Sequence, residues 1–548
     1  MPLDMLITGR IATLAGDSGF GWVEAIGIRD GRVAFAGSEV DLETRADPFT
    51  ERIALAPDEV AIPGITDAHL HVATAADARR NVDLNDAATL DEGLVRIGTA
   101  HRAASPDAWL EGHGWDADRW GGWPSAAALE SVAPGRRGAF WAHDRHALLV
   151  SRAALEAAGI DRDTPDPPGG IIGRDHDGEP DGMLYEAATR RVIGLVPRLS
   201  TGELESAIVA VAQELLALGV VAAHDPGKLT PDPDLEWAYP AYARLSERAA
   251  LPIRIIASIR DDGLDTAVAG GLRSGDILGA DPAGRARVGW QKAFADGSLG
   301  SRTAALLDDI EPEPDRPLPE EQRRGVWITQ PEALRELVDK AAAGGIATQI
   351  HAIGDAAVRA ALDALTPTAR GLPFMPKIEH VQLVDPADVG RFAAAGIVAS
   401  VQPVHLGSDA IQARHLWGDR AERNGYVWGS IAATGAVIAF GTDAPVESFD
   451  PWPGIALAVR REDARWPAGT APYGPDEVLT LDRALRAACV DPAISAREGD
   501  RGRLTVGQRA DVVVIPAAAI DDPVEPGGAL ATARPSIVLL DGRVVFER

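Results

Sequence analysis

The stretch PGITDAHLH, residues 63–71, decides how the rest of the chain is interpreted. A turn containing glycine leads into an apolar run that ends with two histidines, His69 and His71, on either side of one leucine. In a β-strand, alternate side chains point to the same face, so these two imidazoles would project together. The pair predicts the floor of a metal site that later segments of the chain complete.

The bulk composition is that of a large acidic globular protein. The chain has 548 residues, of which 46% are hydrophobic and 24% charged, and its net charge is −28. This length allows two or three domains with a large core. The acidic balance argues against nucleic acid or an anionic membrane as a partner, because both would be repelled. We expect a small-molecule substrate, and a homodimer is left open.

Cysteine content and the N-terminus favour a cytoplasmic protein. The only cysteine, Cys489, cannot form an internal disulfide, which fits a reducing compartment. The first residues, MPLDMLITGR, lack the basic and apolar segments of a signal peptide. No apolar run reaches the ~18–20 residues that a membrane-spanning helix needs.

Both ends of the chain are rich in β-strand patterns. Asp-Gly pairs at 30–31 and 541–542 lie between apolar runs and predict two hairpins. Neither terminal piece is large enough to bury a sheet face alone. We therefore predict that residues 1–60 and 485–548 pair into one small β-sandwich domain.

The region between them, residues 61–484, alternates short apolar runs with amphipathic helical stretches such as 204–219 and 331–345. This alternation predicts an α/β fold with a parallel sheet, and the number of units indicates a closed (β/α)8 TIM barrel. The eight expected strands are 61–71, 219–225, 253–259, 287–296, 347–354, 377–383, 397–405 and 436–445.

A long insertion is expected after the first barrel strand, at about 75–200, because roughly 150 residues separate the first two strands. It contains five of the thirteen tryptophans. In GHGWDADRWGGWP (112–124), glycines adjoin Trp115 and Trp120, which suggests a mobile lid with apolar walls over the barrel mouth. Such walls would favour an apolar or aromatic group in the substrate.

Residues that can bind metal lie at or near the ends of five predicted strands. In an α/β barrel these ends converge on one mouth. Imidazole nitrogen and carboxylate oxygen suit zinc and similar divalent ions. Individually, Asp443 could cap a turn and Lys292 could be a surface lysine, but their positions favour a shared metal site. The candidates are His69, His71, Lys292, His351, His380 and Asp443.

These segments together resemble the amidohydrolase superfamily, and more narrowly its third branch, which includes N-substituted formamide deformylases. The matching motifs run in order along almost the whole chain: PGITDAHLH, KAFADGSLGSRTAAL (292–306), QIHAIGDAAV (349–358), IEHVQL (378–383), SVQPVH (400–405), FGTDAPV (440–446) and GRLTVGQRADVVVI (502–515). The resemblance implies a (β/α)8 barrel flanked by a β-sandwich built from both termini.

The resemblance also implies a binuclear metal centre, with zinc as the expected ion and a single ion as the alternative. His69 and His71 would bind the more buried ion together with Asp443, and His351 and His380 would bind the second. Lys292 would carry CO₂ as a carbamate that bridges both ions. A carbamate offers two anionic oxygens, whereas an ammonium group has no lone pair.

The implied reaction is hydrolysis of a non-peptide carbon–nitrogen bond, as in a small amide or an N-substituted formamide. A metal-activated hydroxide would attack, and Asp443 would carry its proton to the leaving amine. His405, expected at the end of strand seven, would donate a hydrogen bond to the substrate or oxyanion. Glu379 alternates away from His380 in the strand pattern and is expected to be structural.

Further substrate contacts are expected from His143 and His146 in WAHDRHA and from Arg302 in DGSLGSRTA, besides Trp115 and Trp120. His143 and His146 could equally belong to a polar turn. Arg302 could hold a substrate carboxylate or stabilise its own loop.

Two other functions remain open at this stage. The first is a deaminase or cyclic-amide hydrolase with one metal ion, against which Lys292 argues. The second is a barrel without activity that binds or regulates, which the complete set of candidate ligands disfavours.

Overall fold

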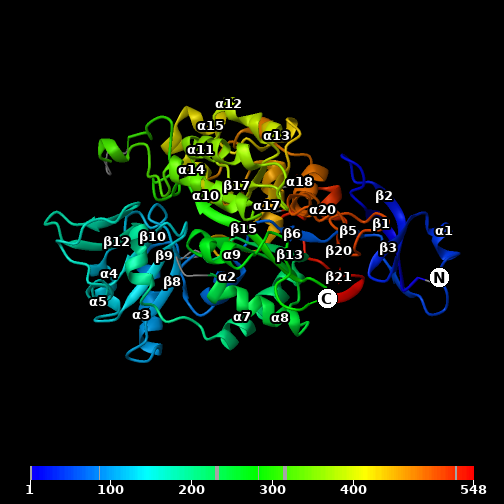
Figure 1. Ribbon diagram of the computed structural model, residues 1–548, viewed down its shortest axis with the longest axis horizontal. Helices are drawn as coiled ribbons and strands as arrows, with labels where there is room; N and C mark the ends of the chain where they lie inside the picture. The colour runs from blue at the N-terminus through cyan, green and yellow to red at the C-terminus, as the bar shows by residue number, and fades with distance from the viewer. Residues whose placement is uncertain (1–2, 86, 229–233, 282, 313–317, 525–527) are drawn as a thin grey trace.

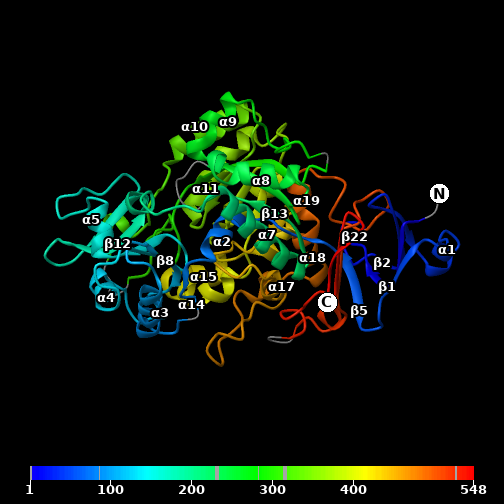
Figure 2. The same cartoon turned by 90° about the horizontal axis from the view of Figure 1, so that it is seen from below.

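The computed structural model describes residues 3–85, 87–228, 234–281, 283–312, 318–524 and 528–548. Its strands form three sheets that lie along the long axis of the molecule (Figure 1). A sheet from both chain termini lies at one end, the barrel in the middle and the insertion at the other end. The perpendicular view in Figure 2 shows the same order.

The central sheet has eight parallel strands whose order follows the chain, from β6 to β19. It closes where the Ala68 N–H donates to the Phe440 carbonyl over 2.8 Å, so the prediction of a (β/α)8 barrel is confirmed. The strands are β6 (Ile65–Asp67), β13 (Val220–Asp225), β14 (Arg254–Arg260), β15 (Ala286–Phe294), β16 (Thr348–Ala352), β17 (Lys377–His380), β18 (Val398–Val401) and β19 (Ile438–Phe440).

The first predicted strand, 61–71, is in fact two strands that belong to different sheets. β5 (Glu59–Pro63) pairs with the terminal sheet, and only β6 belongs to the barrel. Gly64 separates them at a close contact, where a Cβ atom would lie 2.5 Å from Val221 Cγ2. Strands seven and eight also end earlier than predicted, so His405 and Asp443 lie beyond β18 and β19.

Helices surround the barrel as predicted for the alternating pattern. α7 begins with a capping box between Ser200 and Glu203 and buries an apolar stripe against the barrel. None of the described helices has the length and apolar character that a membrane crossing requires. The main helices of this layer are α2 (Val72–Ala78), α7 (Thr201–Ala217), α8 (Ala238–Glu247), α9 (Leu264–Ala269), α10 (Pro331–Ala343), α11 (Asp355–Leu365), α14 (His405–Trp417), α17 (Pro451–Arg460) and α18 (Leu481–Cys489).

Strands from both ends of the chain pair in the terminal sheet, and both Asp-Gly hairpins are present. Hydrogen bonds join all eight strands into one sheet, so the two-sheet form of the predicted sandwich is not confirmed. The domain limits at 60 and 485 stay predictions, and α18 runs through the second. The strands are β1 (Met5–Ala12), β2 (Trp22–Arg29), β3 (Arg32–Gly37), β4 (Glu51–Ala54), β5, β20 (Val512–Pro516), β21 (Ile537–Leu540) and β22 (Arg543–Glu547).

The insertion is folded structure rather than a long loop. It contains a six-stranded sheet that α3 (Leu90–Ala103), α4 (Ala126–Val132) and α5 (Arg152–Ala157) contact. Trp115 and Trp120 lie in its hydrophobic core. Its strands are β7 (Val82–Asp83), β8 (Leu110–Trp115), β9 (Gly138–Ala142), β10 (Ala147–Val150), β11 (Gly170–Arg174) and β12 (Pro180–Glu186).

A buried ion pair joins the barrel to the terminal sheet. Arg254 on β14 donates to the Asp511 carboxylate over 2.7 and 3.2 Å and to Asp541 over 2.5 Å. The Arg254 and Asp511 side chains are only 6% and 5% exposed. Removing one partner of such a pair leaves an uncompensated buried charge.

We therefore expect Arg254→Ala to lower the free energy of unfolding by about 3–5 kcal/mol in equilibrium urea unfolding. Arg52→Ala removes an exposed pair with Glu43 and is the control, which should leave the unfolding curve unchanged. Identical unfolding curves for the two variants would show that the buried pair does not stabilise the junction between the barrel and the terminal sheet.

Candidate active site

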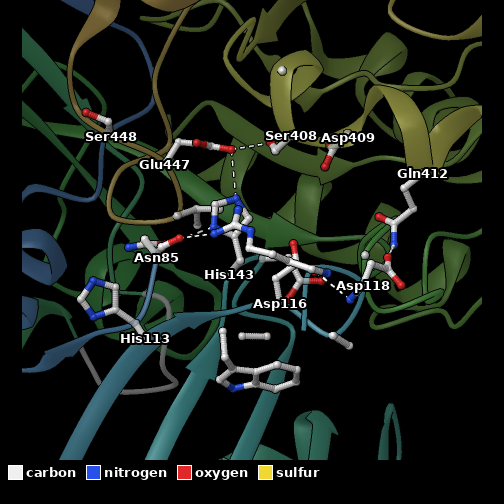
Figure 3. Close-up of a pocket in the computed structure, with 18 of the residues that line it drawn as sticks. Asn85, His113, Asp116, Asp118, His143, Ser408, Asp409, Gln412, Glu447 and Ser448 are labelled. Carbon is white, nitrogen blue, oxygen red and sulfur yellow. Dashed lines mark hydrogen bonds and ion pairs between the residues drawn. The ribbon is translucent and has the colours of Figure 1, made fainter. Parts of the chain in front are cut away.

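Two adjoining cavities lie at the barrel mouth, where the C-terminal ends of the strands meet the insertion. The inner chamber has a volume of about 50 Å³ and the outer cavity about 1440 Å³. The outer cavity is bounded by the insertion, by α14 and by the segment after β19 (Figure 3).

All six predicted metal ligands line the inner chamber, although they come from positions up to 374 residues apart. Each is at most 6% exposed. One ligand atom from each of His69, His380 and Asp443 lies within 4.8 Å of the other two. The structure therefore brings together His69, His71, Lys292, His351, His380 and Asp443.

His69 and His71 meet through a turn and not by alternation along a strand. β6 ends at Asp67, and His71 is the residue before α2. Their Nε2 atoms nevertheless lie 3.3 and 3.2 Å from the same oxygen, Asp443 Oδ1. The expected strand geometry was wrong, but the two side chains do reach one point.

The other ring nitrogen of each imidazole, Nδ1, already has a hydrogen-bond partner. His69 Nδ1 lies 2.6 Å from Glu379 Oε2, and His71 Nδ1 lies 2.5 Å from the Gly227 carbonyl. Because these oxygens can only accept, they assign the protons to Nδ1 and leave both Nε2 lone pairs facing Asp443 Oδ1. Three lone-pair atoms in contact form the environment that a cation fills.

His351 and His380 form a second pair of imidazoles, with ring centroids 4.5 Å apart. His351 Nε2 donates to the Gly297 carbonyl over 2.9 Å, so its Nδ1 carries a lone pair. His380 Nδ1 is buried without a hydrogen-bond partner. Burial and neighbouring cations hold the pKa of both rings well below the usual value, and the neutral imidazole is the form that binds metal.

Lys292 projects its amine into the same chamber without a hydrogen-bond partner for Nζ. Burial lowers the pKa of this amine to about 7, although the carboxylates of Glu379 and Asp443 oppose the shift. A buried polar atom without a partner is costly. Such an amine, partly neutral at pH 7, fits a residue that is modified or paired with charged groups when the site is filled.

Strand alternation directed Glu379 away from the site, but its carboxylate contacts the His69 imidazole. It is fully buried between His69 and Lys377, whose Nζ lies 3.2 Å from Glu379 Oε1. Burial alone would raise the pKa of Glu379, but Lys377 and His69 outweigh it and hold that pKa far below the usual range. The alternation failed because His380 has φ of +73° and turns out of the strand. Lys377 and Glu379 share one face, and this was the signal available in the sequence.

His405 is the first residue of α14, and its Nε2 lies 3.2 Å from Asp443 Oδ2. Burial would lower its pKa, but Asp443, Asp409 and Glu447 raise it to about 9. His405 is therefore a charged hydrogen-bond donor at neutral pH. Asp443 thus contacts His69 and His71 through one oxygen and His405 through the other.

The insertion places two histidines at the cavities. His143 lines both cavities, and its two ring nitrogens lie 3.2 Å from Asn85 Oδ1 and 3.0 Å from Glu447 Oε1 (Figure 3). His146 lines the inner chamber, with Nδ1 2.9 Å from Glu186 and its ring centroid 5.1 Å from that of His351. Both therefore line the cavities at the barrel mouth.

Of the other predicted substrate residues, some line a cavity and one does not. Arg302 lines the outer cavity and donates to Asp118 over 3.2 Å. Trp115 contributes to the cavity wall, whereas Trp120 does not line either cavity. The indole N–H groups of both tryptophans donate to backbone carbonyls, which fixes them as core residues and not as parts of a loose loop.

Comparison with known proteins decides the family. The model of a family described as the amidohydrolase family matches residues 56–546. The chain belongs to the amidohydrolase family. This match spans the barrel, the insertion and most of the C-terminal strands.

Two relatives are similar to this amidohydrolase over most of its length. "Protein LONG AFTER FAR-RED 3" of Arabidopsis thaliana is 31% identical over 527 residues, 93% of this chain and 87% of its own. An N-substituted formamide deformylase of Arthrobacter pascens is 27% identical over 570 residues, 99% of this chain and 98% of its own. The resemblance predicted from the motifs is confirmed at the level of the family.

Solved structures support the fold of this amidohydrolase. An uncharacterized metal-dependent hydrolase from Pyrococcus furiosus superposes with a TM-score of 0.70 and 23% identity, covering 95% of this chain and all of that chain. A second, from Pyrococcus horikoshii, gives a TM-score of 0.71 at 24% identity, covering 93% and 97%.

The contact between Glu379 and His69 predicts an effect on metal affinity. Glu379→Gln should weaken zinc binding about 10- to 100-fold, because the neutral amide holds the His69 ring less firmly and makes it less basic. Competition with a chromophoric chelator measures this affinity.

Glu186→Gln, which alters the partner of His146 instead, is the matched control and should leave zinc affinity near that of the wild type. The double variant Lys377→Met with Glu379→Gln removes both charges of the buried pair, so that neither remains unpaired. It thereby separates an effect on zinc affinity from misfolding. Unchanged zinc affinity in both Glu379 variants would remove this residue from the metal site.

Proposed function

We propose that this protein is a metal-dependent hydrolase of carbon–nitrogen bonds in small amides, with N-substituted formamides as the first substrates to test. Membership in the amidohydrolase family supports this proposal. The observation that carries it is the meeting of the His69 and His71 lone pairs with Asp443 Oδ1 beside the unpartnered amine of Lys292. Two of the proposed roles, the carbamate on Lys292 and the second ion, follow from the family resemblance.

The side chains present fit a divalent metal, with zinc as the expected ion. His69, His71 and Asp443 would hold one ion, and His351 and His380 the second, with carboxylated Lys292 between them. When bound, such ions lower the pKa of water and polarise a carbonyl.

The protein's own groups would then move the proton and orient the substrate. Asp443 takes the proton from the attacking water and passes it to the leaving nitrogen. His405, a cation 3.2 Å from Asp443 Oδ2, fixes the orientation of that carboxylate and can donate to the oxygen that becomes negative. His143 and His146 place further donors on the insertion side.

The unequal volumes of the two cavities support a small acyl group and a larger amine substituent. The inner chamber of about 50 Å³ has room for only a few non-hydrogen atoms, whereas the outer cavity of about 1440 Å³ exceeds most ligand pockets. Its wall includes Trp115, Trp123, Phe449 and Trp466. An N-substituted formamide, with its short acyl group and an apolar substituent, matches this division.

Turnover and metal content test the proposal. With zinc, manganese or cobalt supplied, we expect hydrolysis of N-substituted formamides to exceed that of the matching benzamides, and a chelator to abolish it reversibly. Elemental analysis should find two ions per chain. One ion would favour the mononuclear deaminase or cyclic-amide hydrolase, and no bound metal would favour a binding or regulatory barrel.

Asp443→Asn tests the proton carrier. The amide can still contact His405 but cannot accept a proton, so kcat should fall by about 10²- to 10⁴-fold. Metal content measured on the same sample separates this loss from loss of the ions. A kcat within a few-fold of the wild type would assign the proton transfer to another group.

A further inference from the structure

A small number of residues line both cavities, and we call this group the neck. If the acyl group occupies the inner chamber and the amine substituent the outer cavity, the nitrogen of the bond to be cleaved lies at the neck. This inference rests on the proposed function and concerns which nitrogen substituents the site accepts. Among the described residues, those that line both cavities are His143, Asp144, Gly300, Asp409 and Val446.

Among the described residues, most side chains of the neck have no free hydrogen-bonding atom. Asp144 Oδ2 accepts from the hydroxyls of Ser298 and Ser301 over 2.6 and 2.8 Å, and its Oδ1 accepts from the His146 N–H. Both ring nitrogens of His143 have partners, as described above. Gly300 and Val446 carry no polar side-chain atom.

Asp409 differs from these residues. Its Oδ2 accepts from the Tyr426 hydroxyl over 2.9 Å and from Gln382 Nε2 over 3.1 Å, while Oδ1 has no such partner among the described residues. Asp409 lies one helical turn after His405 in α14, so both side chains are on the helix face toward the chamber. Figure 3 shows the Asp409 carboxylate directed into the cavity near Ser408.

The orientation of this carboxylate is fixed. Tyr426 is buried at 1% exposure and packs edge-on against Tyr473 with ring centroids 5.5 Å apart. Because Tyr426 and Gln382 hold one carboxylate oxygen, the other is presented to the neck in a defined direction. A carboxylate oxygen of this kind can only accept a hydrogen bond when ionised.

We propose that Asp409 Oδ1 accepts the N–H of the amide to be cleaved, so that the site selects secondary amides over tertiary amides and esters. A tertiary amide would place an N-alkyl group against this oxygen. An ester would place an oxygen lone pair there. In both cases the half-buried Asp409 carboxylate loses a donor that the secondary amide supplies, and a site built to bind one N–H group discriminates against analogues without it.

The test compares N-(2-phenylethyl)formamide with its N-methyl derivative on the zinc-loaded full-length protein. We expect the wild type to prefer the secondary amide by about 10- to 100-fold. The preference is measured as a ratio of kcat/KM where the compounds are hydrolysed and as a ratio of Kd by calorimetry where they are not. Failure to hydrolyse either compound would contradict the proposed function, whereas the ratio tests the role of Asp409.

Asp409→Asn is the decisive variant. The asparagine oxygen can still accept hydrogen bonds from Tyr426 and Gln382. Its NH₂ group then faces the neck, where two donors, this group and the substrate N–H, would meet without an acceptor. The preference for the secondary amide should then disappear, and 2-phenylethyl formate, an ester, should gain relative to it. Asp116→Asn, which alters a carboxylate that lines only the outer cavity, is the control and should keep the wild-type preference.

Three results would overturn the proposal. In the first, the wild type gives the same kcat/KM or Kd for the two formamides. In the second, it binds neither of them. In the third, Asp409→Asn keeps the wild-type preference. A variant that weakens both compounds equally would restrict Asp409 to holding Tyr426 and Gln382.

Discussion

The site depends on the closure of the barrel between its last and first strands. At this seam the Ala68 N–H donates to the Phe440 carbonyl over 2.8 Å, and the Asp443 N–H donates to the His69 carbonyl over 2.7 Å. Thr442 adds two hydrogen bonds to the Asp67 carboxylate. These bonds hold the segment after β19 against the turn after β6, so Asp443 meets the histidine pair. Without the closed seam, the first and last ligands of the set would have no fixed separation.

A second constraint is the burial of charge. Lys377 forms an ion pair with Glu379 and donates to the Ala68 carbonyl. Its Nζ lies 4.0 Å from the centroid of the Trp290 ring. Glu379, held in place by Lys377, in turn fixes the His69 ring through a contact of 2.6 Å between Oε2 and Nδ1. A buried charge without partners would be very costly, so the network is stable only when complete. As a result, the His69 proton lies on Nδ1 toward Glu379, and the Nε2 lone pair faces Asp443.

The insertion changes what this chamber can accept. Its sheet and tryptophan core make it a packed wall, which supplies His143 and His146 and encloses the outer cavity with α14. The proposed short acyl group and variable nitrogen substituent rest on this small chamber and the wide cavity beside it. Fold and ligands alone would leave this division undetermined, since they concern only the chamber.

The sequence by itself determined the alternation of strands and helices, the hairpins at both termini, and the residue types at the strand ends, because these depend on local pattern and short spacing. Only the tertiary structure decided how the side chains point. His69 and His71 converge through a turn, and His380 leaves its strand at positive φ, so alternation misplaced Glu379. Asp409 carried no signal, because its free oxygen is defined by Tyr426 and Gln382 on another segment. Contacts between distant segments form only when the barrel closes, and local periodicity does not encode them.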